Sequence, residues 1–217
     1  MRIISGTARG TRLKTPEGQN TRPTADRVKE AMFSILQFDL PGAVVLDLFG
    51  GTGQLGIEAV SRGAKQAVFV DHNEQSCKLI RENLRLAKME KEGRVVRSDY
   101  LAFLKNTKEK FDIILLDPPY AEVFLEKALK LITEIDILQT NGIIVAECPF
   151  GKALPAEFSG YRKIWLIDRR ISGSACCKMR FTTLAGISSA KAAASSTYSS
   201  CSTSFSSLSE KPRISSS

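Results

Sequence analysis

The chain has 217 residues, of which 43% are hydrophobic, enough for one domain of ordinary size with a real core plus appendages. It contains no apolar run of about 18 residues and no apolar leader segment at the start, so neither a membrane span nor a secretory signal is expected. The net charge of +8 predicts an anionic partner, and the five scattered cysteines with a single histidine, His72, predict no metal site, no disulfide framework and a cytoplasmic location.

The amino terminus is a basic segment without acids. Residues 2–5 and 9–14 are predicted to be two short strands joined through a turn at 6–8, and this hairpin carries Arg2, Arg9, Arg12 and Lys14. Such a charge pattern fits either contact with nucleic acid or a solvated surface. Residues 15–23 read as a loop, and a helix is predicted to begin near Thr24, whose hydroxyl can cap it.

From residue 43 onward, apolar runs alternate with amphipathic segments. This pattern predicts a doubly wound α/β domain with a mostly parallel sheet covered on both faces, with ligands bound beyond the carboxyl ends of the strands. The predicted strands are 43–49, 66–71, 93–97, 111–116 and 142–147, and the predicted helices are 53–62, 74–89, 100–106 and 122–133. Two further strands are possible at 163–168 and 178–184.

The carboxyl terminus is rich in serine, with fourteen Ser among the thirty residues 188–217. Such a segment buries too little apolar surface to offset the entropy of ordering, so disorder is expected. We therefore divide the chain into a basic hairpin and loop at 1–23, an α/β domain at 24–185 and a disordered tail at 186–217.

A glycine-rich turn follows the first predicted strand. Gly50, Gly51 and Gly53 allow positive φ angles and close approach of a ligand to the backbone, and the next helix adds free N–H groups. The run also contains the G-x-G-x-x-G spacing of dinucleotide sites. Asp71 ends the next strand, where a carboxylate can accept hydrogen bonds from both ribose hydroxyls of either NAD or S-adenosylmethionine.

Two more acids lie near this turn. Asp99 follows the third strand, where it can bind an adenine amino group or cap the helix at 100–106. Asp47 lies near the end of the first strand, where a buried carboxylate needs either a cationic partner, such as a methionine ammonium, or backbone N–H groups. His72 follows Asp71 at the ribose edge and is a poor general acid there, so a dehydrogenase is disfavoured.

The tetrapeptide Asp117-Pro118-Pro119-Tyr120 follows the strand at 111–116. Because proline lacks an N–H group, Asp117 and Pro118 present only acceptors, and Tyr120 offers a ring for stacking. Acceptors beside a stacking surface suit a nucleobase that carries an exocyclic amine. The pattern is equally compatible with a polar turn when it occurs alone.

Together, DLFGGTG, Asp71 and the DPPY tetrapeptide resemble a class I S-adenosylmethionine-dependent methyltransferase acting on an amino nitrogen. The segments MRIISGTARGTRLKTP and TRPTADRVKEAMFSIL are similar to the RsmD family, the 16S rRNA (guanine-N2)-methyltransferases, over about residues 1–163. The chain departs from the family pattern after residue 163, where a Tyr-Gly-Lys-Thr-like turn is absent.

The resemblance implies a set of site residues and a monomeric enzyme that acts on ribosomal RNA or the small subunit. The implied catalytic residues are Asp117, Pro118, Pro119 and Tyr120. The implied cofactor residues are Asp47, Phe49, Gly50, Gly51, Gly53, Asp71, His72, Asp99 and Tyr100. The implied RNA contacts are Arg2, Arg9, Arg12, Lys14, Arg22 and Thr24. The alternatives are an adenine-N6 DNA methyltransferase, a protein glutamine methyltransferase, and a non-catalytic RNA-binding or ribosome assembly factor.

Overall fold

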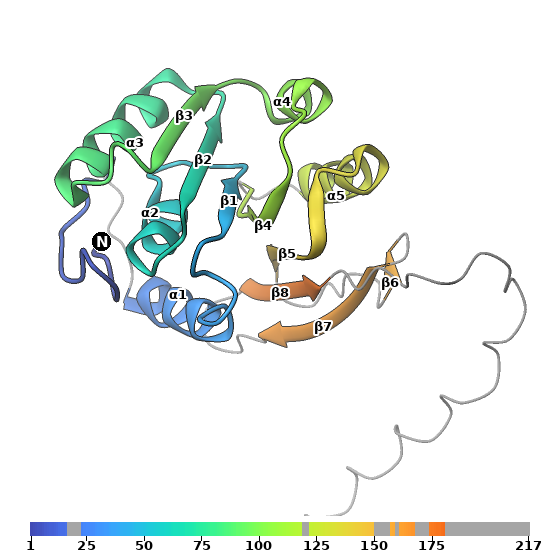
Figure 1. Cartoon of the computed structure of the whole chain (residues 1–217), viewed down its shortest axis with the longest axis horizontal. Helices are drawn as coiled ribbons and strands as arrows, with labels where there is room; N and C mark the ends of the chain where they lie inside the picture. The colour runs from blue at the N-terminus through green and yellow to red at the C-terminus, as the bar shows by residue number, and fades with distance from the viewer. Residues whose placement is uncertain (17–22, 119–121, 150–156, 159–160, 168–173, 181–217) are drawn as a thin grey trace, which may run out of the picture. The chain divides into compact units, whose positions relative to one another are not determined.

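The computed structural model describes residues 1–16, 23–118, 122–149, 157–158, 161–167 and 174–180, which all belong to one compact unit ending at Thr183 (Figure 1). The serine-rich tail lies outside the described residues, so its disorder stays a prediction. None of the described helices combines the length and apolar composition needed to span a bilayer.

The described strands form a single sheet in the order β3-β2-β1-β4-β5-β8-β7-β6. The pairs among β1 to β5 are all parallel, whereas β8, β7 and β6 add to the β5 edge in antiparallel fashion. The prediction of a doubly wound, mostly parallel sheet is therefore confirmed. The strands are β1 Val44–Asp47, β2 Gln66–Asp71, β3 Gly93–Arg97, β4 Phe111–Leu116, β5 Leu138–Pro149, β6 Glu157–Phe158, β7 Tyr161–Ile167 and β8 Ser174–Arg180.

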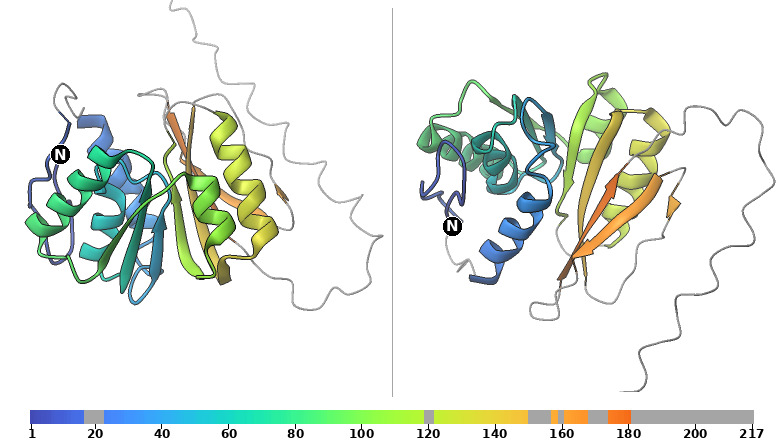
Figure 2. Two further views of the ribbon diagram at one scale, coloured as in Figure 1. Left: turned by 90° about the horizontal axis from the view of Figure 1, so that it is seen from above. Right: turned by 60° about the horizontal axis from the view of Figure 1, so that its bottom comes forward.

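Helices cover both faces of the sheet (Figure 2). The helices are α1 Pro23–Ile35, α2 Gln54–Ser61, α3 Glu74–Ala87, α4 Tyr100–Asn106 and α5 Glu122–Ile135. Side chains of α1, α2 and α3 share one buried cluster with one face of the sheet, and side chains of α4 and α5 share a second cluster with the other face. The strand order reverses between β1 and β4, so a crevice is expected at the carboxyl ends of these two strands.

The amino-terminal hairpin is more irregular than predicted. Its ladder is reduced to one bridge, Arg2 to Arg12, and no strand spans 2–5 or 9–14. The Ile3 N–H still donates across the hairpin to the Thr11 carbonyl, but the Ser5 N–H donates to the carboxylate of Glu58 on α2, as does that of Ile4, so the ladder does not continue through Ser5. We call residues 1–14 the arm; it lies beside α2 and α3 (Figure 1).

The start of helix α1 agrees with the prediction to within one residue, whereas the Thr24 cap and the start of the last possible strand are wrong. Helix α1 begins at Pro23 rather than with Thr24 as a cap, because proline has the φ angle that suits the first helical position. The last predicted strand, 178–184, instead begins at Ser174, because β8 pairs along β5 as far as Pro149. Strands β6, β7 and β8 complete the sheet, and the connection between β7 and β8 at 168–173 lies outside the described residues.

The contact of the arm with α2 leads to a paired prediction. Gly6 and Gly10 both have positive φ, +88° and +86°, but a Cβ on Gly6 would lie 1.7 Å from the carbonyl oxygen of Ser61, whereas a Cβ on Gly10 would meet nothing within 4 Å. Both alanine substitutions should cost about 1–2 kcal/mol for the left-handed backbone. Gly6→Ala should cost a further 1–3 kcal/mol, roughly, for the overpacked contact, measured by urea unfolding. Equal losses in the two variants would contradict this packing.

Candidate active site

The glycine turn after β1 is tightly packed against the next strand and helix. The Gly50 N–H donates to the Val70 carbonyl at 2.9 Å, and the Gly53 N–H donates to the Gly50 carbonyl at 2.6 Å. Gly53 has φ +77° and precedes the first residue of α2, and a Cβ there would lie 3.1 Å from the Ile80 side chain. Larger residues would therefore displace the turn, which presents its backbone at the carboxyl edge of the sheet.

Asp71 fastens this turn to the end of β2. Its Oδ2 accepts a hydrogen bond from the Gly51 N–H at 2.9 Å, and its Oδ1 accepts one from the Asn73 N–H at 2.8 Å. The His72 imidazole lies 3.6 Å from Oδ1, and its side chain is 80% exposed. A carboxylate has about four acceptor positions, so Asp71 retains capacity for a further donor.

Asp47 is a buried carboxyl beneath the turn. It is 1% exposed, and the Gly56 N–H donates to its Oδ2 at 3.1 Å. The pKa of Asp47 is raised to about 7, mainly by burial; the Gly56 hydrogen bond opposes the shift, and the nearby Asp71 carboxylate adds to it. The backbone N–H foreseen as one possible partner is therefore present.

Asp99 caps helix α4. Its Oδ1 accepts hydrogen bonds from the N–H groups of Leu101 and Ala102, at 2.9 and 3.2 Å. Of the two interpretations left open by the sequence, the helix cap is the one observed. The adenine contact remains a prediction for the second carboxylate oxygen, which takes no hydrogen bond from the described residues.

Three aromatic rings from different elements meet near the same edge. The ring centroids of Phe49 and Tyr100 lie 5.2 Å apart, and Tyr100 meets Phe124 of α5 edge-on at 5.7 Å. Phe124 is 39% exposed and was not foreseen as a site residue. Its position, an aromatic residue in the first turn of the helix that follows the tetrapeptide, could have indicated from the sequence that Phe124 lies near the site.

The tetrapeptide begins at the edge that carries the glycine turn. In the β1–β4 register Asp47, the last residue of β1, pairs with Leu115, so Asp117 follows the end of β4 at the same edge where the glycine turn follows β1. Asp117 and Pro118 are half-buried. Pro119 and Tyr120 lie outside the described residues, so their roles stay predictions.

The arm cations do not share one environment. Arg2 lies 3.9 Å from Asp26, and the Lys14 ammonium pairs with Glu82 at 2.8 Å. Arg9 and Arg12 are exposed and form no ion pair with any described residue. Among the other implied RNA contacts, Arg22 and the Thr24 side chain lie outside the described residues.

Asn83 connects the arm to the glycine turn. This fully buried side chain on α3 accepts from the Lys14 N–H at 2.7 Å and donates to the Lys14 and Thr52 carbonyls at 3.1 and 2.9 Å. Sequence reasoning missed Asn83, although a polar residue between the buried Ile80 and Leu84 of an amphipathic helix was a signal. Because it bonds only to backbone groups, its partners could not be read from residue types.

Glu58 is a second missed residue, and it anchors the start of the arm. Its carboxylate accepts from the N–H groups of Ile4 and Ser5 and from the Arg62 Nε at 2.8 Å, and it lies 3.5 Å from the Lys29 ammonium. Burial lowers the pKa of Lys29, and the Glu58 charge opposes that shift. Glu58 is the one charged residue in the otherwise apolar stretch Ile57–Val60, and this pattern could have indicated a buried, partnered carboxylate.

The sheet order, the helices on both faces and the glycine turn at the switch point define a class I methyltransferase, Rossmann-like fold. The model of the family described as "Conserved hypothetical protein 95" matches residues 1–180, so the chain belongs to this family. The resemblance to the RsmD family is thereby confirmed, and the match includes the segment after residue 163 that departs from the expected pattern.

Individual relatives agree with this assignment. The chain is 36% identical over 157 residues to "Ribosomal RNA small subunit methyltransferase D" of Haemophilus influenzae, covering 71% of this chain and 81% of that protein. The structure of a hypothetical protein from Thermus thermophilus has a TM-score of 0.68 and 28% identity, covering 82% and 98% of the two chains. An RNA methyltransferase from Salinibacter ruber, in complex with S-adenosyl-L-homocysteine, shares the fold at 16% identity, with a TM-score of 0.58 and coverage of 76% and 95%.

The buried Asp47 predicts a specific pH dependence of stability. Its pKa lies near 3.8 in the unfolded chain and at about 7 in the fold, so the folded protein retains a proton that the unfolded chain releases between these values. Its contribution to the free energy of unfolding is therefore greatest below about pH 4 and is lost as the pH rises to about 7, by up to about 1.4 kcal/mol per pH unit.

Asp47→Asn retains an acceptor for the Gly56 N–H but removes this titration. Urea unfolding from about pH 4 to pH 8 should show a flatter stability profile for Asp47→Asn than for the wild type. Asp136→Asn, at a side chain that is 78% exposed, is the matched control and should follow the wild-type slope. Parallel profiles for wild type and Asp47→Asn would show that Asp47 is ionised in the fold.

Proposed function

We propose that this protein transfers a methyl group from S-adenosylmethionine to the exocyclic N2 of a guanine in small-subunit (16S) ribosomal RNA. Family membership and the relatives support rRNA methylation by an S-adenosylmethionine-dependent methyltransferase. The observation that carries the proposal is the shared edge: β1 and β4 are paired in parallel, and the glycine turn and Asp117 follow their neighbouring carboxyl ends.

The residues at the end of β1 and β2 fit this cofactor. A Cβ on Gly51 would meet only the Phe49 carbonyl oxygen, at 3.8 Å, so the backbone is open to a ligand on that side. Asp71 retains acceptor capacity for ribose hydroxyls, and the Asp47 carboxyl is placed to attract a cationic ammonium. The rings of Phe49 and Tyr100 provide an apolar wall nearby.

When bound, S-adenosylmethionine supplies a sulfonium methyl group, so the protein has to position the amine acceptor. The lone pair of a guanine amine is delocalised into the ring and is a weak nucleophile. Hydrogen bonds from this amine to the Asp117 carboxylate and the Pro118 carbonyl favour a pyramidal nitrogen whose lone pair faces the methyl carbon. The new N–C bond forms as the S–C bond breaks, and the amine proton passes to Asp117 or to water.

Orientation supplies most of the rate enhancement in this proposal. Correctly oriented reactants gain roughly 7–11 kcal/mol of barrier relief relative to free reactants. The target guanine has to leave its stack, at a cost of a few kcal/mol, and Tyr120 is proposed to stack on the extruded base.

Product analysis tests the reaction itself. Transfer of a labelled methyl group to small ribosomal subunits and to naked 16S rRNA, followed by nucleoside analysis, should yield N2-methylguanosine. Recovery of N6-methyladenosine, or transfer to protein alone, would replace the proposal with one of its alternatives. Cofactor affinity by calorimetry without any transfer to either substrate would also contradict it.

Asp117→Ala should lower turnover by on the order of 10²-fold or more, because comparable preorganised groups contribute this much. The affinity for S-adenosylmethionine, measured by calorimetry, should stay near the wild-type value because the glycine turn and Asp71 are intact. Asp136→Asn, at an exposed side chain paired with Lys110, serves as the control and should retain turnover. Undiminished turnover in Asp117→Ala would remove Asp117 from the mechanism.

A further inference from the structure

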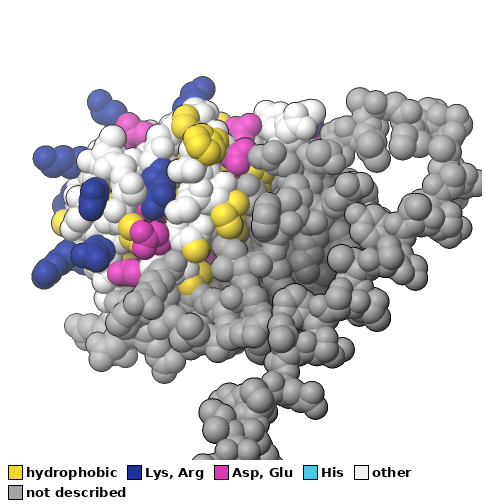
Figure 3. Space-filling view, turned by 90° about the horizontal axis from the view of Figure 1, so that it is seen from below, with side chains coloured by type: hydrophobic (Ala, Val, Ile, Leu, Met, Phe, Trp, Pro, Cys, Tyr) yellow, Lys and Arg dark blue, Asp and Glu magenta, His cyan; other side chains and the backbone are white. Residues whose placement is uncertain are grey.

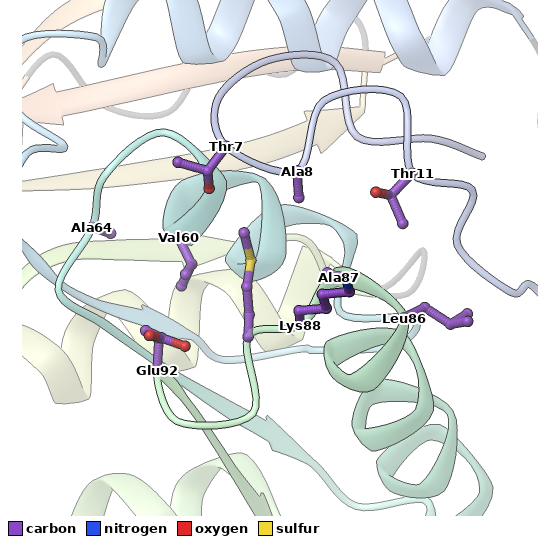
Figure 4. Close-up of a pocket in the computed structure, with 10 residues that line it drawn as sticks. Thr7, Ala8, Thr11, Val60, Ala64, Leu86, Ala87, Lys88 and Glu92 are labelled. Atoms are coloured by element: carbon purple, nitrogen blue, oxygen red, sulfur yellow. The ribbon is translucent and has the colours of Figure 1, made fainter.

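A second concave surface lies where the arm turns beside the carboxyl-terminal end of α3. It is a cavity of about 550 Å³, within the range of about 300–1,000 Å³ that small-ligand sites occupy (Figure 4). We call it the arm–α3 groove. Its walls include Thr7, Ala8 and Thr11 from the arm and Leu86, Ala87 and Lys88 from α3 and the residue that follows it.

The arm–α3 groove is separate from the candidate active site. Helices α2 and α3 both begin at the carboxyl edge of the sheet and end at the opposite edge, and the groove is lined by residues that follow their last turns, Ala64 and Met89. Since α3 has 14 residues at about 1.5 Å each, the two places lie about 20 Å apart along the helix.

Lys88 and Glu92 both line the groove, and further cations lie on the two segments that form its walls. Arg81, Arg85 and Lys88 recur at helical spacing, so they lie on one side of α3, and all three are exposed. They form no ion pair with the described residues, and neither do Arg9 and Arg12 of the arm. On the side of the molecule where Figure 1 places the arm and α3, Figure 3 shows several Lys and Arg side chains with fewer Asp and Glu side chains among them.

The interior of the groove is of mixed polarity. Thr7 and Thr11 contribute hydroxyl groups, and Glu92 contributes a carboxylate, beside the apolar Leu86 and Met89 (Figure 4). Hydroxyl and carboxylate groups can bind a ribose 2′-OH or the edge of an unpaired base, whereas apolar side chains can contact its face. Glu92 would repel a phosphate or an acidic side chain inside the cavity alike, so a base or a ribose is the part of an RNA that the cavity suits.

We propose that the arm–α3 groove is a second docking site for the RNA substrate, distant from the target base. Phosphates lie against Arg9, Arg12, Arg85 and Lys88, and one unpaired nucleotide enters the cavity. This inference rests on the proposed function and extends it, since the substrate then has to reach across about 20 Å of protein. Short RNA hairpins that carry only the target guanine should therefore bind less tightly than the whole 16S rRNA.

The test removes two cations beside the groove and compares the effect with that of removing two cations on another part of the surface. Arg85→Gln/Lys88→Gln is compared with Lys105→Gln/Lys108→Gln, whose exposed lysines lie in and after α4 on the other face of the sheet and form no ion pair with described residues. Binding of 16S rRNA is measured by filter retention over a series of salt concentrations, with thermal unfolding of each variant to verify folding.

In a plot of log affinity against log salt, the slope for the groove variant should be smaller in magnitude by about 1.4–1.8 than that for the wild type. Each of the two lost phosphate contacts contributes about 0.7–0.9 to this slope. The KM for RNA should rise while kcat changes little, because these residues lie far from the reacting atoms. The α4 control should keep the wild-type slope.

Equal slopes for the groove variant and the α4 control would overturn the inference and identify these cations as a solvated face. Competition by polyglutamate as effective as that of RNA, at equal charge concentration, would also overturn it. Failure of the proposed function is distinguishable from both outcomes. If the groove variant shows the expected change in salt slope but the wild-type protein methylates no guanine, the groove is retained as an RNA-binding site and the proposed reaction is wrong.

Discussion

The buried carboxylate of Glu58 is the constraint on which the arrangement of this protein depends. An isolated charge in the interior is costly, and this one is offset by two backbone N–H groups of the arm and by the Lys29 and Arg62 cations. These partners come from the arm, from α1 and from the residue that follows α2. The Glu58 side chain therefore joins the segment proposed to contact RNA to the helix that follows the glycine turn. Loss of a partner would leave the buried carboxylate with fewer groups to offset its burial.

Backbone groups are also central to the carboxyl edge of the sheet. Asp71 and Asp47 each accept from N–H groups near the glycine turn, and Asn83 joins that turn to Lys14 of the arm. The proposed cofactor site and the proposed RNA-binding arm thus share a buried polar network. Networks of this kind hold groups in a fixed geometry, which is what a reaction limited by orientation requires.

Much of the fold was predictable from local patterns. The first five strands and the helices between them follow from apolar runs and periodicity, and the glycine turn, Asp71 and Asp117 were located correctly relative to strand ends. The hairpin at 2–5 and 9–14 is present as one antiparallel bridge rather than as two full strands, and the N–H groups of Ile4 and Ser5 bind Glu58, more than fifty residues away. Asp99 left two interpretations open, and only the observed helix geometry identified it as a cap.

Hydrophobic period, glycine spacing and short motifs are local properties of the chain, so they were enough to predict the class of fold, the family and the residue types at the strand ends. The folded structure was needed to show that Glu58, Lys29 and Asn83 are buried partners of the arm and that residues of the arm and of α3 line one groove. The physical reason is that hydrogen bonds to backbone groups, and burial itself, depend on which distant segments meet. The type of a residue does not by itself indicate which distant segment it will contact.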